Sequence, residues 1–250
     1  MCFEPSALPP LPPVSGGSVS QRDLVLEAQD GNRFAAVEAT GFNEPGSGVV
    51  VLPDVRGLFR FYEELASQFA AQGYDSVAID YFGRTAGVGK RGSEFPYSGH
   101  VAKVTFEGVR ADVAAAVAHL RLDDPQRKEF TVGFCFGGSN SWHQAANGHG
   151  LAGAIGFYGN PNRLDDPTPV IERVYDMECP ILGLMGGNDP GIPAEVIERF
   201  DAALATAGVA HEIVTYPGAP HSFFDRAYDQ YREESEDAWK RVLEFLSTHS

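Results

Sequence analysis

Hydrophobic and polar positions along the chain form two alternating kinds of segment. Short runs of apolar and β-branched residues, such as GVVVLP at 48–53 and EFTVGF at 129–134, are typical of strands buried on both faces of a sheet. Between them lie longer segments with helical spacing, such as residues 59–72, which end at Gly73. Strands that alternate with helices predict a mostly parallel sheet with right-handed crossovers.

The same pattern predicts the other elements and the domain organisation. A hairpin is expected at 22–29 and 33–40 around the turn DGN, further strands at 75–82, 151–159, 179–187 and 211–218, a Gly-rich loop at 83–99, and helices at 101–122, 139–148, 194–207 and 228–248. Residues 1–20, rich in Pro, Gly and Ser, are expected to form an extended arm. Residues 21–250 are expected to form one domain.

Charge and cysteine content narrow the class of protein. The formal net charge of −15 argues against nucleic-acid or anionic-membrane partners, because phosphates need clustered Lys and Arg. The three cysteines, Cys2, Cys135 and Cys179, have neither disulfide-framework nor metal-ligand spacing. No signal peptide and no run of roughly 18 apolar residues is visible. We therefore expect a cytoplasmic protein without a metal or cofactor.

Several chemically capable residues follow separate predicted strands. They are Asp54, Arg84, Cys135, Asp189 and His221. In open α/β sheets, functional groups gather beyond the carboxyl ends of the strands. A nucleophile, an acid and a histidine in this order along the chain are typical of the α/β-hydrolase triad. The expected fold is thus an α/β-hydrolase fold, with a mostly parallel sheet of about seven or eight strands, flanking helices and an antiparallel N-terminal hairpin at one edge.

The segment around Cys135 supports a nucleophilic role. Gly133 to Gly137 reads G-x-C-x-G, the nucleophile-elbow pattern with sulfur in place of oxygen. The following helix N-terminus favours a thiolate. His221 could take the thiol proton, and Asp189 could hold the imidazole in the required tautomer.

The oxyanion formed by the attack needs fixed hydrogen-bond donors. The backbone amide of Phe136 is the first candidate, because it follows the nucleophile. The second is expected in the loop after GVVVLP, at the amide of Val55.

Together, GFCFGG, GGND and GAPHSF resemble the dienelactone hydrolase family from about Gly48 to the C-terminus. The resemblance implies an α/β-hydrolase with a Cys135–Asp189–His221 triad that acts on lactones or small esters. LPDVRGL and DYFGR fall where the family has its oxyanion loop and a substrate-binding arginine, which makes Arg84 the candidate carboxylate binder.

Two positions depart from the family pattern. Asp54 stands where dienelactone hydrolase has a glutamate that pairs with the resting thiol, so Asp54 is expected to modulate Cys135. Asp225 stands where the family has a second substrate arginine, and Arg226 is one residue later. The family motifs predict the hydrolase class. The carboxylate of Asp225, at a position where the family has a cation that faces an anionic substrate, means that they do not also predict dienelactone as the substrate.

Each candidate also has a structural interpretation. Cys135 could fill the core, Asp189 could serve a turn, Arg84 could pair with a surface acid, and Asp54 could cap a helix. Cys179 is expected in the core. Tyr97, Trp142 and Phe223 are candidates for substrate binding, from a pool of aromatic residues that also holds Phe59, Tyr62, Phe82 and Tyr158, although aromatic residues are more often part of a core.

The leading functional hypothesis is hydrolysis of a lactone or small carboxylic ester through an acyl-enzyme on Cys135. The alternative is a non-catalytic or thiol-dependent protein that binds a small ligand. A thiol redox protein would need a second cysteine near Cys135 to resolve its intermediates, and Cys179 is expected at the opposite end of a strand. A cysteine peptidase would want a groove-forming insertion. The expected partner is a small ester or lactone, neutral or anionic, bound by a monomer or a small homo-oligomer.

Overall fold

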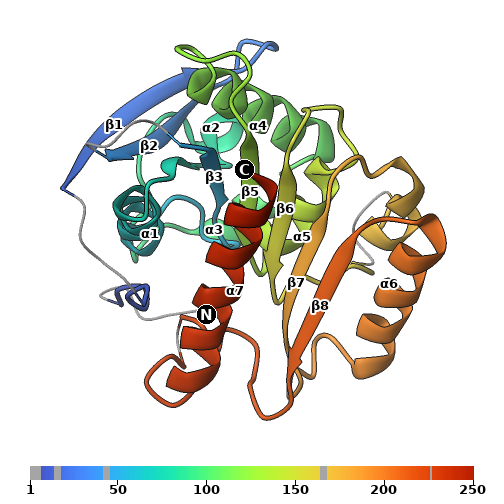
Figure 1. Ribbon diagram of the computed structural model, residues 1–250. Coiled ribbons are helices and arrows are strands. Elements are labelled where there is room, and N and C mark those ends of the chain that lie inside the picture. The colour runs from blue at the N-terminus through green and yellow to red at the C-terminus, as the bar shows by residue number, and fades with distance from the viewer. Residues whose placement is uncertain (1–6, 14–17, 42–45, 164–167, 226) are drawn as a thin grey trace.

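One eight-stranded sheet organises the protein. The structure is a computed structural model, and it describes residues 7–13, 18–41, 46–163, 168–225 and 227–250. The sheet has the order β1-β2-β4-β3-β5-β6-β7-β8 (Figure 1). Its strands are β1 (Val19–Glu27), β2 (Arg33–Gly41), β3 (Gly48–Leu52), β4 (Asp75–Ile79), β5 (Glu129–Phe134), β6 (Gly153–Phe157), β7 (Ile181–Gly186) and β8 (His211–Tyr216).

Parallel pairing dominates the sheet. β1 and β2 form an antiparallel hairpin at one edge, and β2 is also antiparallel to β4. All pairs from β4 through β3, β5, β6 and β7 to β8 are parallel. The predicted α/β-hydrolase architecture, including its antiparallel hairpin, is therefore confirmed.

Helices cover both faces of the sheet (Figure 1). They are α1 (Arg60–Ala71), α2 (Gly83–Ala86), α3 (Tyr97–Val101), α4 (Phe106–Leu120), α5 (Phe136–Gln144), α6 (Ala194–Ala207) and α7 (Arg232–His249), with short 3₁₀ turns at Val170–Glu172 and Val174–Asp176. Residues of α1 and α7 share one core cluster, whereas α4 contributes to a second and α5 and α6 to a third. Among the described residues, no helix is both long and apolar enough to cross a membrane.

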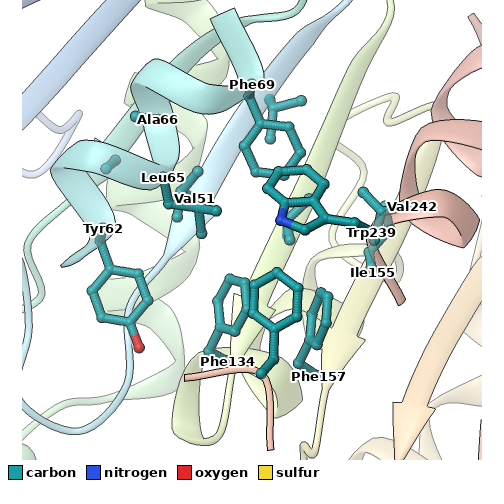
Figure 2. Packing of buried hydrophobic residues seen from close by; sticks show 14 of the residues in the cluster. Val51, Tyr62, Leu65, Ala66, Phe69, Phe134, Ile155, Phe157, Trp239 and Val242 are labelled. Carbon is teal, nitrogen blue, oxygen red and sulfur yellow. The ribbon is translucent and has the colours of Figure 1, made fainter. Parts of the chain in front are cut away.

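Aromatic side chains form the core beneath α1 and α7 (Figure 2). Phe134 and Phe157, on the adjacent strands β5 and β6, stack with ring centroids 4.6 Å apart. Trp239 of α7 lies 5.0 Å from Phe69 of α1, which joins the two helices over the sheet. Alternate strand residues face opposite cores, since Val49 and Val51 belong to this cluster and Val50 belongs to the one beneath α4.

Some helix boundaries differ from the prediction. The helix predicted at 101–122 corresponds to α4, which begins only at Phe106, and its first predicted residue, Val101, is the last residue of α3. Thr105 sets this start, because its Oγ1 atom accepts a hydrogen bond from the Gly108 amide at 3.1 Å and caps α4. The predicted loop at 83–99 contains α2 and the start of α3. The helix predicted at 139–148 begins earlier, at Phe136, and the last helix begins later, at Arg232.

The described part of the N-terminal arm packs against the domain. Residues 7–13 have no regular secondary structure. The carbonyl of Pro10 accepts a hydrogen bond from the Trp239 indole at 2.8 Å, and that of Pro9 accepts one from the Gln68 amide at 3.3 Å. Residues 1–6, which include Cys2, and residues 14–17 lie outside the described residues. The first strand already begins at Val19.

Candidate active site

Cys135 occupies a strained turn between β5 and α5. Its φ is 56° and its ψ is −113°, a conformation that non-glycine residues rarely adopt. A Cβ atom at Gly133 would clash with the carbonyl oxygen of Gly137, and one at Gly137 would clash with those of Leu52 and Pro53. The turn is therefore tight enough to require both glycines of the G-x-C-x-G motif. It leaves Cys135 partly exposed at the N-terminus of α5.

His221 and Asp189 are joined by a short hydrogen bond. Asp189 lies in the loop after β7 and His221 in the loop after β8. The His221 Nδ1 atom lies 2.6 Å from the Asp189 Oδ2 atom. The amide of Gly191 donates to the other oxygen, Oδ1, at 2.8 Å and fixes the carboxylate. A carboxylate at this distance places the imidazole proton on Nδ1 and orients the ring.

A pocket of about 240 Å³ brings the predicted residues together. Cys135, His221, Val55 and Phe136 all line it. Asp189 reaches the pocket through its hydrogen bond to His221. The four sequence segments meet because their strands are parallel and end at the same edge of the sheet.

The loop after β3 is held from several sides. The Tyr81 hydroxyl donates to the carbonyl of Pro53 at 3.0 Å, and the amide of Asp54 donates to the Tyr62 hydroxyl at 3.1 Å. Within the described part of the chain, the amides of Val55 and Phe136 donate no hydrogen bond. Two unengaged donors in the pocket that holds the thiol are what an oxyanion site requires.

The carboxylate of Asp54 is fully buried and pairs with Arg56. The Arg56 Nη2 atom lies 3.1 Å from Asp54 Oδ2, and the Arg56 amide donates to Oδ1 at 2.9 Å. Asp54, Asp80 and Cys135 all lie close enough to Tyr81 to add to the effect of burial, which raises the pKa of that phenol well above its ordinary value. Asp54 thus lies in the region of Cys135, with its charge balanced by a guanidinium.

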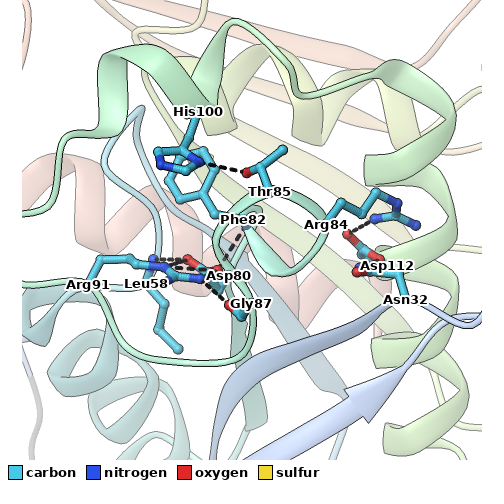
Figure 3. Close-up of polar contacts among 10 residues, drawn as sticks. All are labelled: Asn32, Leu58, Asp80, Phe82, Arg84, Thr85, Gly87, Arg91, His100 and Asp112. Atoms are coloured by element: carbon cyan, nitrogen blue, oxygen red, sulfur yellow. Dashed lines mark hydrogen bonds and ion pairs between the residues drawn. The ribbon is translucent and has the colours of Figure 1, made fainter.

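The candidate carboxylate binder Arg84 is not among the residues that line the pocket, and Figure 3 shows it paired with Asp112 instead. Its guanidinium is held by the carboxylates of Asp112 and Asp30, each at 2.6 Å. These ion pairs join α2 to α4 and to the turn of the β1–β2 hairpin. Figure 3 also shows a second buried pair, in which Arg91 binds Asp80 at 2.8 Å. The position of Arg84 supports the surface-pairing alternative rather than substrate recognition.

Three of the aromatic candidates are not among the residues that line the thiol pocket. Trp142 is fully buried, donates to the carbonyl of Leu182 at 3.1 Å and packs on Phe200. Phe223 is fully buried in the core beneath α1 and α7. Tyr97 begins α3 and packs against the core beneath α4. Their places agree with the core interpretation of these aromatic residues.

Three further pocket residues follow β6, and of these the sequence had offered only Tyr158, as one of its aromatic candidates. Tyr158, Asn160 and Arg163 all line the thiol pocket. The ring of Tyr158 lies 5.0 Å from that of His221, and its hydroxyl donates to the buried carboxylate of Asp225 at 2.8 Å. The signal that could have found Asn160 and Arg163 is their position beyond the carboxyl end of a buried strand.

Asp225, at the position of the family's second arginine, is therefore occupied by a structural contact to Tyr158. Arg226 lies outside the described residues. Cys179 is buried in the core beneath α5 and α6, where burial raises the pKa of its thiol to about 12. No group of three or more His, Cys, Asp or Glu side chains in the described ranges could hold a metal ion.

The sheet, the strained elbow and the histidine–carboxylate pair define an α/β-hydrolase. The family model described as "Dienelactone hydrolase family" matches residues 34–250, and the chain belongs to that family. It is 33% identical over 209 residues to a protein of Salmonella typhimurium named "Putative carboxymethylenebutenolidase", covering 80% of this chain and 77% of that protein. A protein of the same name from Methylorubrum extorquens is 30% identical, covering 90% and 79% of the two chains.

A solved structure agrees with these sequence relatives. The crystal structure described as a "Putative Dienelactone Hydrolase" from Klebsiella pneumoniae has a TM-score of 0.82 and 27% identity to this chain. The match covers 92% of this chain and 99% of that one. The similarity therefore includes the whole hydrolase domain.

Proposed function

We propose that the protein hydrolyses a lactone or a small carboxylic ester through an acyl-enzyme on Cys135. The observation that carries the proposal is the strained Cys135 turn, which opens on the same pocket as His221, whose ring Asp189 holds at 2.6 Å. The name of the sequence relatives refers to a butenolide, which is a lactone. The small size of the pocket around Cys135 suits a small acyl group.

Acylation begins when His221 takes the Cys135 proton and the sulfur attacks the carbonyl carbon. The negative charge that develops on the carbonyl oxygen is stabilised by the amides of Val55 and Phe136. When the carbonyl re-forms, the carbon–oxygen single bond of the ester breaks. His221 returns its proton to the departing alkoxide, which in a lactone remains tethered to the acyl group.

Deacylation repeats the same proton transfers with water as the nucleophile. His221 removes a proton from water, and the hydroxide attacks the thioester carbon. Collapse of the second tetrahedral species breaks the carbon–sulfur bond and releases the carboxylic acid. The thiolate of Cys135 recovers the proton from His221. Asp189 stabilises the imidazolium in both half-reactions.

Hydrolysis of 4-nitrophenyl acetate and of a panel of enol-lactones tests the proposal. Cys135→Ala should lower kcat at least roughly 10³-fold while the circular-dichroism spectrum and melting temperature stay close to those of the wild type. Cys179→Ala is the matched control, since it removes a thiol distant from the pocket. Retained turnover in Cys135→Ala would overturn the assignment. Binding of the panel without turnover by the wild type would instead favour the ligand-binding alternative.

A further inference from the structure

In the described part of the chain, three residues other than glycine have a positive φ, and all three lie at the candidate active site. They are Cys135 at 56°, Tyr158 at 37° and Ser222 at 63°. Cys135 is the proposed nucleophile, Tyr158 lines its pocket, and Ser222 directly follows His221. Such conformations cost free energy and persist where the surrounding structure fixes them, which is typical of functional sites. The strained backbone of Tyr158 is therefore a first indication that this residue serves the site.

The ring of Tyr158 packs against the ring of His221. The two ring centroids lie 5.0 Å apart, and the ring planes are inclined by 57°. Tyr158 is fully buried, whereas 31% of the His221 side chain is exposed. The hydrogen bond from Nδ1 to Asp189 holds one atom of the imidazole, and the ring can still tilt about that bond. Contact with a buried, fixed ring restricts this tilt.

Tyr158 is itself held at both ends. Its hydroxyl donates to the Oδ2 atom of Asp225 at 2.8 Å, and Asp225 is only 4% exposed. A hydrogen bond to a carboxylate is stronger than one between neutral groups. The backbone amide of Tyr158 donates to the carbonyl of Leu184, in β7, at 2.8 Å. The position of the Tyr158 ring is therefore fixed from the sheet and from the far end of the side chain.

Asp225 belongs to the same turn as His221. The amide of Asp225 donates to the carbonyl of Ser222 at 3.3 Å, and the amide of Ala227 donates to the same carbonyl at 3.2 Å. Tyr158 follows β6, whereas His221 and Asp225 follow β8. The hydrogen bond between Tyr158 and Asp225 therefore ties the loop after β6 to the turn that carries His221.

We propose that Tyr158 is a positioning residue for His221, and that Asp225 anchors it through the Tyr158 hydroxyl. The Tyr158 ring keeps the imidazole in the orientation that its proton transfers require, while Asp189 holds Nδ1. The proposal rests on the proposed function. It gives Asp225 a supporting role at the position where the family has a substrate-binding arginine. This role depends on the hydrogen bond and the ring contact, not on the charge of Asp225.

Two substitutions of Asp225 separate the hydrogen bond from the charge. Asp225→Asn keeps an oxygen that can accept from the Tyr158 hydroxyl, and should retain at least roughly half of the wild-type kcat with 4-nitrophenyl acetate. Asp225→Ala removes the acceptor and should lower kcat at least roughly tenfold, with KM changed less than about threefold, because His221 acts in the chemical steps. Tyr158→Phe removes the other end of the same bond and should match Asp225→Ala. A kcat in Asp225→Asn as low as in Asp225→Ala would overturn the proposal.

Tyr216→Phe is the matched control for loss of a phenol–carboxylate hydrogen bond. The Tyr216 hydroxyl donates to Asp237 at 2.9 Å, and its ring packs on Phe223, as the ring of Tyr158 does. Tyr216 is not among the residues that line the thiol pocket. Tyr216→Phe should therefore keep kcat within about twofold of the wild type. Equal kcat values in Tyr158→Phe and Tyr216→Phe would contradict the proposal, and Asp225→Ala measures the same bond if Tyr158→Phe melts much earlier than the control.

Nuclear magnetic resonance of the His221 ring distinguishes failure of this inference from failure of the proposed function. The protein has seven histidines, and in a sample labelled with ¹³C at histidine Cε1 the signal that disappears in His221→Gln is that of His221. Its order parameter should fall by at least roughly 0.1 in Tyr158→Phe and Asp225→Ala, and should stay at the wild-type value in Tyr216→Phe. This measurement needs no turnover, so it decides the role of Tyr158 even if Cys135 is not the nucleophile. Equal order parameters in the wild type and Tyr158→Phe would reject the positioning role.

Discussion

Arg56 binds Asp54 twice, with its guanidinium at 3.1 Å from Oδ2 and its backbone amide at 2.9 Å from Oδ1. Both side chains are buried, and the residue between them is Val55, a proposed oxyanion donor. The Gly57 amide also donates to the carbonyl of Asp54, at 3.1 Å. We infer that Asp54 positions the Val55 amide by fixing this turn. The sequence had instead suggested that Asp54 acts on the thiol.

Asp54→Ala separates these two roles. If Asp54 positions the loop, the substitution should lower kcat by roughly 10²-fold, as loss of one oxyanion donor does. The rate at which iodoacetamide alkylates Cys135 should then change less than about twofold, because in that case Asp54 acts on the Val55 amide and not on the thiol. Asp54→Asn keeps an oxygen for the Arg56 amide and should lose less activity. A marked acceleration of alkylation in both variants would instead show that the carboxylate controls the thiol.

The hydrogen bond between His221 and Asp189 predicts non-additive losses. Asp189→Asn should lower kcat/KM by roughly 10³- to 10⁴-fold, because an amide favours the wrong imidazole tautomer. Adding His221→Ala to Cys135→Ala should change the residual rate by less than roughly threefold, since members of one catalytic unit fail together. Losses that multiply in the double variant would show that the two residues act independently.

The two described thiols should differ in reactivity. Burial raises the pKa of Cys179 to about 12, whereas Cys135 is partly exposed in the pocket. At pH 8 the native protein should react with iodoacetamide at Cys135 much faster than at Cys179, because the thiolate is the nucleophile. Peptide mapping by mass spectrometry measures both rates. Faster labelling of Cys179 would contradict its place in the core.

Glu129, at the start of β5, predicts a pH-dependent stability. Its side chain is fully buried, and its two oxygens have no hydrogen-bond partner within the described ranges. Burial raises the pKa of this carboxyl from 4.5 to about 7. The folded state therefore holds the proton more tightly than the unfolded chain. The resulting stability is complete below pH 4.5 and is lost as the pH rises through 7.

Urea unfolding of Glu129→Gln at pH 5 and at pH 8 measures this effect. The wild type should lose up to about 3 kcal/mol more stability than the variant between the two pH values, because the amide does not ionise. Any constant cost of burying the amide cancels in the comparison. Glu244→Gln, an exposed change on α7, should follow the wild type. Parallel pH profiles for wild type and Glu129→Gln would contradict the prediction.

The elements that hold the candidate site were predictable because local patterns specify them. The apolar run of β5 and the flanking glycines indicate the Cys135 turn, and parallel pairing of the strands implies that Asp189 and His221 lie at the same edge. Thr105 shows the limit of periodicity, since its capping hydroxyl starts α4 several residues later than the apolar pattern predicts.

The surroundings of the site were less predictable because they depend on distant partners. Arg84 looked available in the sequence, yet its acids are Asp30 and Asp112, far along the chain in both directions. Arg163 and Arg173 lie in irregular segments after β6, so no periodic pattern in the sequence shows which way their side chains point. Both line a cavity of about 510 Å³ that becomes visible only when α4 and α5 pack beside each other.

Mass spectrometry of the intact protein during turnover tests the central claim most directly. After rapid acid quenching of a reaction with 4-nitrophenyl acetate, the wild type should carry one added acetyl group, and peptide mapping should place it on Cys135. Neutral hydroxylamine should remove the group, as expected for a thioester, and Cys135→Ala should show no such adduct. An adduct on another residue, or turnover by Cys135→Ala at the wild-type rate, would contradict an acyl-enzyme on Cys135.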